Sequence, residues 1–162
     1  PYPLLGLDSD NGAEFINYNL LRYCEQEGIT FTRCRPYRKN DQAYVEQKNW
    51  TAVRQVVGYD RYEGQAACDA LNALYEPLRL YLNFFQPVMV LLHKERDGAK
   101  VKKVYDQAKT PYQRVLESPD VSDEIKTHLR ELYQTLNPAD LLRQIEARQE
   151  ELWKLAHRPM SK

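Results

Sequence analysis

The first 33 residues place one helical pattern between two short apolar segments, and this order constrains the fold more than any other feature. Residues 4–10 are mostly apolar and short enough for a buried strand, and the Asn-Gly pair that follows tolerates the positive φ of a tight turn. Asn17 can cap a helix that Gly28 would end, and residues 29–33 then alternate apolar and polar side chains. The order predicts two parallel strands joined by a right-handed helical crossover.

Asp10 and Glu46 are the carboxylates that most constrain the chemistry. Asp10 closes the first predicted strand, so we expect it at the C-terminal edge of the sheet. Glu46 lies in a helical pattern whose apolar face comprises Val45, Ala52, Val53 and Val56. Its position next to Val45 puts Glu46 at the rim of that face, where a carboxylate can point into a cleft.

Several motifs at fixed offsets carry a family resemblance. Residues 7–15, the Arg35-Pro36-Tyr37 segment, and Gln42 four residues before Glu46 resemble the second half of the catalytic core of a DDE transposase or retroviral-type integrase. Residues 81–87 and 110–114 resemble bacterial transposases of the insertion-sequence type. The resemblance implies an α/β, ribonuclease-H-like fold over about residues 1–90. Because only nine residues precede Asp10, we expect a core that is truncated at its N-terminus and lacks the first catalytic Asp.

The resemblance also implies the site residues. Asp10 would be the second Asp and Glu46 the Glu of the triad, both catalytic and both metal ligands. Two Mg²⁺ or Mn²⁺ ions in the complete parent enzyme would support DNA integration by phosphodiester strand transfer, a chemistry that carboxylate-held divalent cations favour. DNA at the element ends and at the target would contact residues on the loop and helix around Glu46, namely Tyr37, Arg38, Lys39, Gln42, Lys48, Asn49 and Arg54.

Other interpretations of these residues stay open. Asp8 shares a strand face with Asp10, but its spacing to Glu46 differs from the family's, so we expect it on the surface or behind the metal ligands. We expect Trp50 to pack in the interior, with stacking on a nucleotide as the alternative. With two of three metal ligands the chain alone should be inactive, so whether it is an enzyme stays undecided. It is a mobile-element transposase fragment, a noncatalytic DNA-binding or assembly remnant, or another nuclease of the same fold.

Charge is segregated although the formal net charge is zero. Residues 33–61 and residues 94–114 each carry a net charge of +4, which suits a polyphosphate partner such as DNA. A solvated surface balanced by the acidic C-terminal third is the alternative. The dispersed residues Cys24, Cys34 and Cys68 predict free thiols rather than a zinc site. No apolar run is long enough for a membrane span, so the expected location is the bacterial cytoplasm, in association with the nucleoid.

The rest of the chain is predicted to be mainly helical. Residues 63–85 carry an apolar stripe, which Pro77 should kink or split near Tyr75. Residues 91–118 form a basic arm or linker with an extended or irregular structure, in which Asp97-Gly98 and Thr110-Pro111 are predicted to form turns. Residues 119–162 form C-terminal helices that begin after Ser122 and Asn137, and the last has a stripe that packs on its own domain or pairs with a second copy in a homo-oligomer.

Overall fold

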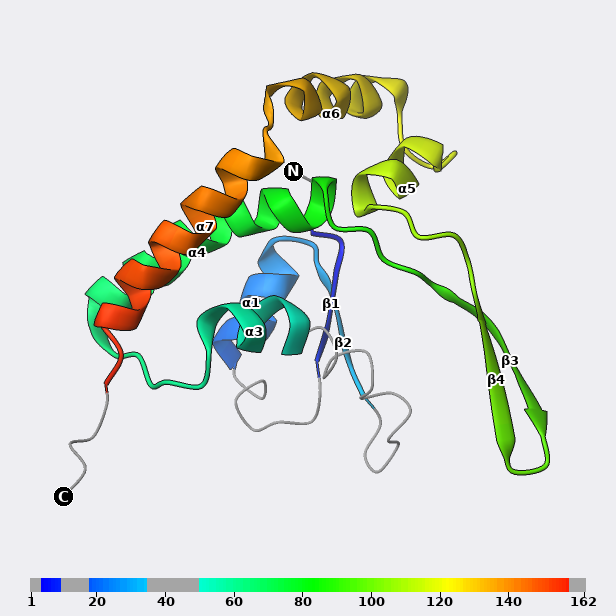
Figure 1. Cartoon of the computed structure of the whole chain (residues 1–162), viewed down its shortest axis with the longest axis horizontal. Helices are drawn as coiled ribbons and strands as arrows, with labels where there is room; N and C mark the ends of the chain where they lie inside the picture. The colour runs from blue at the N-terminus through cyan, green and yellow to red at the C-terminus, as the bar shows by residue number, and fades with distance from the viewer. Residues whose placement is uncertain (1–3, 10–17, 35–49, 158–162) are drawn as a thin grey trace. The chain divides into compact units, whose positions relative to one another are not determined.

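The computed structural model describes residues 4–9, 18–34 and 50–157 (Figure 1). Its contacts divide the chain into two compact units, residues 1–60 and residues 61–162, which are described separately. In the described part of the chain helices predominate, and the strands form two small sheets of two strands each. The predicted domain boundaries after residues 90 and 118, and the ribonuclease-H-like fold, stay predictions.

The first unit contains the predicted order of strand, helix and strand. Strand β1 (Gly6–Ser9), helix α1 (Tyr18–Gln26) and strand β2 (Thr30–Arg33) follow one another in the sequence. The two strands are parallel and in register from Gly6 opposite Thr30 to Ser9 opposite Arg33. Gly28 ends the helical segment with a φ of 67°, which an L side chain rarely adopts. The parallel pairing and the helix end are therefore confirmed.

Strand β1 is more exposed than the sequence predicted. Leu4 and Leu5 are 57% and 75% exposed, and within the strand only Ser9 is buried. The physical reason is that β2 is the one described strand paired with β1. The prediction of a buried strand is thus wrong for this arrangement.

A helical segment follows residue 49 in the first unit. It consists of the π-helix η2 (Trp50–Arg54) and the short helix α3 (Gln55–Val57). Val57 is buried and Val53 and Val56 are half-buried, in agreement with an apolar face on this helix. Trp50 is 52% exposed, so the prediction that it packs in the interior is wrong.

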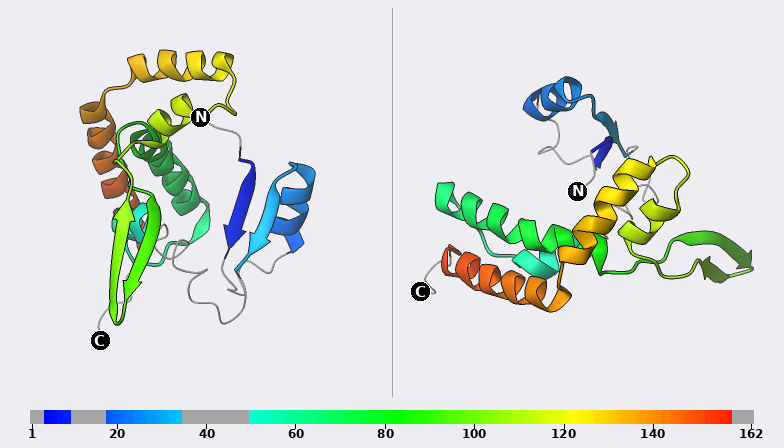
Figure 2. Two further views of the ribbon diagram at one scale, coloured as in Figure 1. Left: turned by 90° about the vertical axis from the view of Figure 1, so that its right-hand side faces the viewer. Right: turned by 90° about the horizontal axis from the view of Figure 1, so that it is seen from above.

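In the second unit, helices α4 (Gly64–Phe84) and α7 (Pro138–Lys154) lie side by side (Figures 1 and 2). The backbone N–H of His157 donates to the carbonyl of Arg61 at 2.8 Å, which joins the start of α4 to the end of α7. The buried side chains between the two helices include Ala67, Leu74 and Leu78 of α4 and Leu141, Ile145 and Leu152 of α7. The apolar stripe of α7 therefore packs on a helix of its own chain.

Helix α4 continues through Pro77, so of the predicted kink or split near Tyr75 the split is wrong and the kink stays a prediction. Proline lacks a backbone N–H and therefore cannot donate the helical hydrogen bond to the carbonyl of Ala73. Pro77 is buried together with Leu74 and Leu78. Packing of this apolar face stabilises the helix on both sides of the proline, which local propensity alone does not predict.

Residues 91–118 are more regular than the sequence predicted. Strands β3 (Leu91–Asp97) and β4 (Lys100–Tyr105) form an antiparallel hairpin, and helix α5 (Pro111–Glu117) follows it. Gly98 in the two-residue loop has a φ of 57°. Thr110 and Pro111, predicted to form a turn, are the cap and first residue of α5. In Figure 1 the hairpin extends away from the helices of this unit.

Helix α6 (Asp123–Thr135) completes the second unit beside an aromatic cluster. Ser122 and Asn137 cap α6 and α7 through their side chains, as predicted. The rings of Tyr112 and Tyr133 stack with their centroids 4.9 Å apart, and Phe84 lies 5.0 Å from Tyr112. The cluster therefore joins the end of α4 to α5 and α6. No helix in the described segments combines the length and hydropathy needed to cross a bilayer.

Candidate functional site

Most of the predicted site residues lie outside the described residues. These are the predicted metal ligands Asp10 and Glu46 and the predicted DNA contacts Tyr37, Arg38, Lys39, Gln42, Lys48 and Asn49. The described segments contain no group of three His, Cys, Asp or Glu residues that could hold a metal ion. Asp10 lies between the described residues Ser9 and Tyr18, and the others lie between Cys34 and Trp50.

The two segments that contain the predicted metal ligands leave the sheet from neighbouring positions. Ser9, the last residue of β1, lies opposite Arg33, the last residue of β2. The backbone N–H of Cys34 donates to the carbonyl of Ser9 at 2.9 Å, so the pairing extends to the end of both strands. Asp10 follows Ser9 in the sequence, and the segment with Glu46 follows Cys34. This edge, at the carboxyl ends of parallel strands, is where ligand sites of α/β proteins form.

Asp8 lies on the surface of the first unit. Its carboxylate accepts a hydrogen bond from the hydroxyl of Thr32 at 2.9 Å, and these two residues are opposite one another in the strand register. The contact is a side-chain pair across the two strands, a common means of sheet stabilisation. Asp8 thus has a local structural partner, and it provides a matched control for substitutions at Asp10.

Arg54 is the predicted DNA contact that the structure describes. It ends η2, and its guanidinium carbon lies 5.0 Å from the centroid of the Tyr59 ring. Tyr59 is 76% exposed, so this cation–π contact is at the surface. Because a guanidinium stacked on a ring still presents N–H donors at its edge, Arg54 stays able to bind a phosphate.

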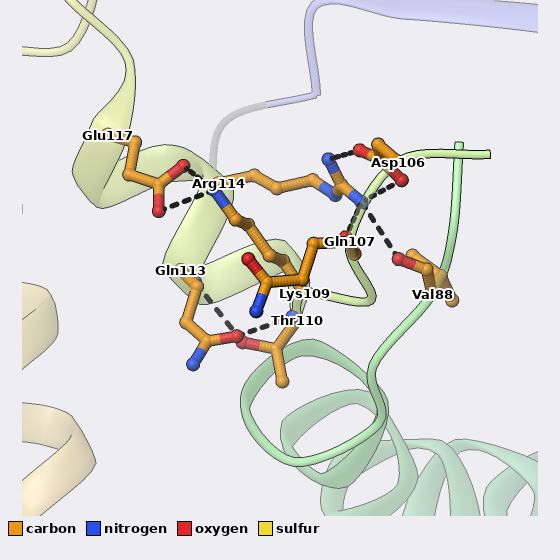
Figure 3. A network of polar contacts seen from close by, with 8 residues as sticks. All are labelled: Val88, Asp106, Gln107, Lys109, Thr110, Gln113, Arg114 and Glu117. Carbon is orange, nitrogen blue, oxygen red and sulfur yellow. Dashed lines mark hydrogen bonds and ion pairs between the residues drawn. The ribbon is translucent and has the colours of Figure 1, made fainter. Parts of the chain in front are cut away.

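A second group of polar contacts holds the base of the β3–β4 hairpin (Figure 3). Arg114 of α5 donates from Nη1 to Oδ2 of Asp106 at 2.6 Å and from Nη2 to the carbonyl of Val88 at 2.8 Å. The other oxygen of Asp106 accepts from the backbone N–H of Val90 at 2.6 Å. Arg114 therefore binds the segments before β3 and after β4. Its hydrogen bond, helped by the Val90 N–H, holds the pKa of Asp106 below its ordinary value.

Helix α5 is itself fixed beside this contact. The Thr110 hydroxyl accepts from the backbone N–H of Gln113 at 3.1 Å, and the Gln113 side chain accepts from the Thr110 N–H at 2.8 Å. This reciprocal capping box satisfies donors that the start of a helix leaves unpaired. Lys109 donates to both carboxylate oxygens of Glu117, at 2.6 and 2.9 Å (Figure 3). The hairpin thus starts from an ordered base.

The hairpin carries exposed cations that lie opposite one another, an arrangement that was not predicted from the sequence. Lys94 lies directly opposite Lys103 across the two strands, and both are exposed. Gly98 and Ala99 form the two-residue loop, and a Gly at the first loop position is typical of a tight hairpin turn, so Gly98 is the signal in the sequence. The turn and the lysines are visible in the sequence, but the opposition of Lys94 and Lys103 depends on the strand register and was not predicted.

Comparisons with known proteins give one informative similarity. A stretch of 114 residues, 70% of this chain, is 48% identical to a protein of Sinorhizobium fredii (strain NBRC 101917 / NGR234) described as "Uncharacterized protein y4rM". The match covers 33% of that protein, so the chain spans about a third of the length of this curated relative. No protein-family model matches the chain, and no solved structure matches it.

Proposed function

We propose that this chain is part of a metal-dependent DNA transposase or integrase, in which Asp10 and Glu46 are two of the carboxylates that hold the metal ions. The observation that carries the proposal is the end of the β1–β2 pair. Ser9 and Cys34 are joined there by a backbone hydrogen bond, so the segments that continue to Asp10 and Glu46 begin side by side. The sequence motifs around both residues, described above, supply the reaction class.

The donor chemistry fits Mg²⁺ or Mn²⁺. Both ions prefer carboxylate oxygen, and Mg²⁺ keeps several waters, so few protein ligands suffice for each ion. In the complete enzyme such ions would stabilise charge on the attacking and leaving oxygens of a phosphodiester. The residues of this chain would hold the ions at the sheet edge, and Arg54 would bind a nearby phosphate.

The exposed apolar residues just before β1 favour a larger parent sheet. Leu4 and Leu5 are mostly exposed, and β1 has one described partner strand. A sheet of two strands is marginally stable unless more strands or helices cover it. Further strands of the parent protein, one of them carrying the third carboxylate, would cover these leucines. The match covers 33% of the longer relative, and this coverage agrees with the proposal that the chain is part of a larger protein.

Iron-directed cleavage of the backbone tests the predicted metal site without requiring catalytic activity. Fe²⁺ can replace Mg²⁺ at oxygen-ligand sites, and with ascorbate and peroxide it generates radicals that cut the chain near the bound ion. We expect cuts near both residue 10 and residue 46, suppressed by excess Mg²⁺ and mapped by mass spectrometry. Asp10→Asn and Glu46→Gln should each weaken the cuts, because by the resemblance each side chain would hold one ion of the pair.

The matched control is Asp8→Asn, which removes a carboxylate two residues before Asp10 on the same strand. Since Asp8 is bonded to Thr32, this variant should keep both cuts. Cleavage at both positions that survives Asp10→Asn and also survives Glu46→Gln would refute the metal site and with it the proposed function.

A further inference from the structure

The register of the β3–β4 hairpin separates its charges into two different faces. Residues opposite one another in an antiparallel pair share a face, and successive residues alternate between faces. The register of β3 shifts between Leu91 and His93, so the faces are assigned from the paired residues on either side of this shift. One face then carries Leu91, Lys94, Arg96, Val101, Lys103 and Tyr105, here called the cationic face. The opposite face carries His93, Glu95, Asp97, Lys100, Lys102 and Val104, here called the balanced face.

The cationic face holds three positive charges and no carboxylate. Lys94 and Lys103 are directly opposite one another, an arrangement in which like charges destabilise a strand pair. Lys94, Arg96 and Lys103 make no ion pair with any residue in the described segments, and all three are exposed. An anion bound across these side chains would remove the repulsion.

The balanced face compensates its charges within the hairpin. Lys102 lies opposite Glu95, and Lys100 lies opposite Asp97. The His93 ring also contacts the carboxylate of Glu95 at 3.1 Å. Since two lysines meet two carboxylates there, this face has no excess of cations to attract a polyanion. The two faces therefore differ in charge although they belong to the same pair of strands.

The shape and support of the hairpin suit an extended polyanion. The hairpin extends from the helices in Figures 1 and 2, and Arg114 binds both of its ends at the base (Figure 3). A two-stranded ribbon is narrow enough to enter the major groove of DNA. Tyr105, 45% exposed, and Val101, 49% exposed, add apolar surface beside the cations.

We propose that the cationic face of the β3–β4 hairpin binds the phosphate backbone of duplex DNA through Lys94, Arg96 and Lys103. The inference rests on the proposed function for the choice of DNA as the polyanion, whereas the hairpin geometry supplies the site. Contacts with phosphates position a protein on DNA without reading its sequence. This binding should therefore be independent of DNA sequence and sensitive to salt.

The test compares two double variants that remove the same charge from opposite faces. Lys94→Gln with Lys103→Gln alters the cationic face, and Lys100→Gln with Lys102→Gln alters the balanced face. The whole chain is titrated with a fluorescent duplex of about 30 base pairs at about 50 to 200 mM salt. The cationic-face variant should lower the slope of log affinity against log salt by about 1.8, and weaken binding on the order of tenfold or more at about 0.1 M salt.

The balanced-face variant should stay within about twofold of the wild-type affinity, because Lys100 and Lys102 would not face phosphates. Circular dichroism and thermal unfolding of both variants check that the hairpin substitutions leave the fold intact. Removing the opposed pair of Lys94 and Lys103 relieves repulsion, so a loss of folding is not expected from the cationic-face variant.

The outcomes separate this inference from the proposed function. If both double variants weaken DNA binding equally, or if neither weakens it, the hairpin site is overturned. DNA binding by another part of the chain would still be compatible with that result. If the wild-type chain binds no duplex at any salt concentration, both the hairpin site and the DNA partner fail. Stronger binding to phosphatidylglycerol vesicles than to DNA, lost in the cationic-face variant, would replace DNA by an anionic lipid surface. The iron cleavage experiment tests the metal site independently.

Discussion

Arg114 is the side chain on which the position of the hairpin depends. Its guanidinium binds the carboxylate of Asp106 and the carbonyl of Val88, whereas its Nε is buried without a hydrogen-bond partner among the described residues. The side chains of Arg114 and Asp106 are 29% and 21% exposed. A charge-assisted bond between two partly covered groups resists competition by water better than an exposed ion pair does. The ionisation of Asp106 should therefore affect stability.

The pH dependence follows from the lowered pKa of Asp106. Because Arg114 stabilises the ionised carboxyl, the pKa in the folded state is below that in the unfolded state. The contribution to stability is fully present above the ordinary Asp pKa of about 3.9 and is lost as pH falls through the lower folded-state pKa. Asp106→Asn should lower the urea midpoint at neutral pH, and its difference from wild type should shrink in acid.

Asp120→Asn is the control for this measurement. Asp120 is an exposed carboxylate, and none of its described contacts involves its side-chain oxygens. Its substitution should leave both the neutral urea midpoint and the acid profile close to wild type. An Asp106→Asn midpoint that differs from wild type by the same amount at neutral and acidic pH would show that the ionised bond to Arg114 is not the cause.

At the scale of elements, the pairing of α4 with α7 brings together buried apolar side chains of the second unit. Leu74 of α4 and Leu152 of α7 are both fully buried. The side chain of Asn137 caps the start of α7. After its end, the backbone N–H of His157 donates a hydrogen bond to the carbonyl of Arg61. Buried leucines at such a helix pair contribute through transfer from water and through close packing.

Leu74→Ala should lower the free energy of unfolding of the second unit by about 2 to 5 kcal/mol, the usual cost of removing a buried leucine side chain. Urea unfolding followed by circular dichroism measures the change. Glu76→Ala, an exposed position on the same helix, is the matched control and should change the free energy by less than about 0.5 kcal/mol. Similar losses in the two variants would show that helix propensity, not burial at the α4–α7 interface, dominates.

At the scale of the whole molecule, the two units differ in how complete their cores are. The second unit joins α4 to α7 along their length and to α5 and α6 through stacked aromatic rings. The described part of the first unit has a pair of four-residue strands, with exposed leucines just before β1. A unit with its own buried core can fold independently, whereas a two-stranded sheet needs further cover.

A chain of residues 61–162 should therefore keep its helical circular dichroism signal and unfold cooperatively on heating. Its unfolding midpoint should lie close to that of the corresponding transition in the whole chain, because the contacts that build this unit lie within residues 61–162. Thermal scans of the two proteins measure this. A shortened chain that is unfolded, or that melts without a cooperative transition, would show that residues 1–60 are required for this core.

The sequence by itself determined the features that depend on a few neighbouring residues. The caps at Ser122 and Asn137, the helix end at Gly28, and the order of β1, α1 and β2 were all predicted. A cap is satisfied within one helical turn, and a strand or helix period is visible in its own segment, so local chemistry suffices for these features. The candidate residues Asp10 and Glu46 came from sequence motifs, and their convergence stays a prediction.

Only the tertiary structure decided which surfaces meet. The continuity of α4 through Pro77, the exposure of Trp50, and the packing of α7 on α4 depend on residues far away in the sequence. The opposition of Lys94 and Lys103 depends on the register of two strands, including the shift near Leu91. A shift of one residue moves every side chain of a strand to its other face, so composition and charge count cannot assign a cationic face, whereas the folded pairing does.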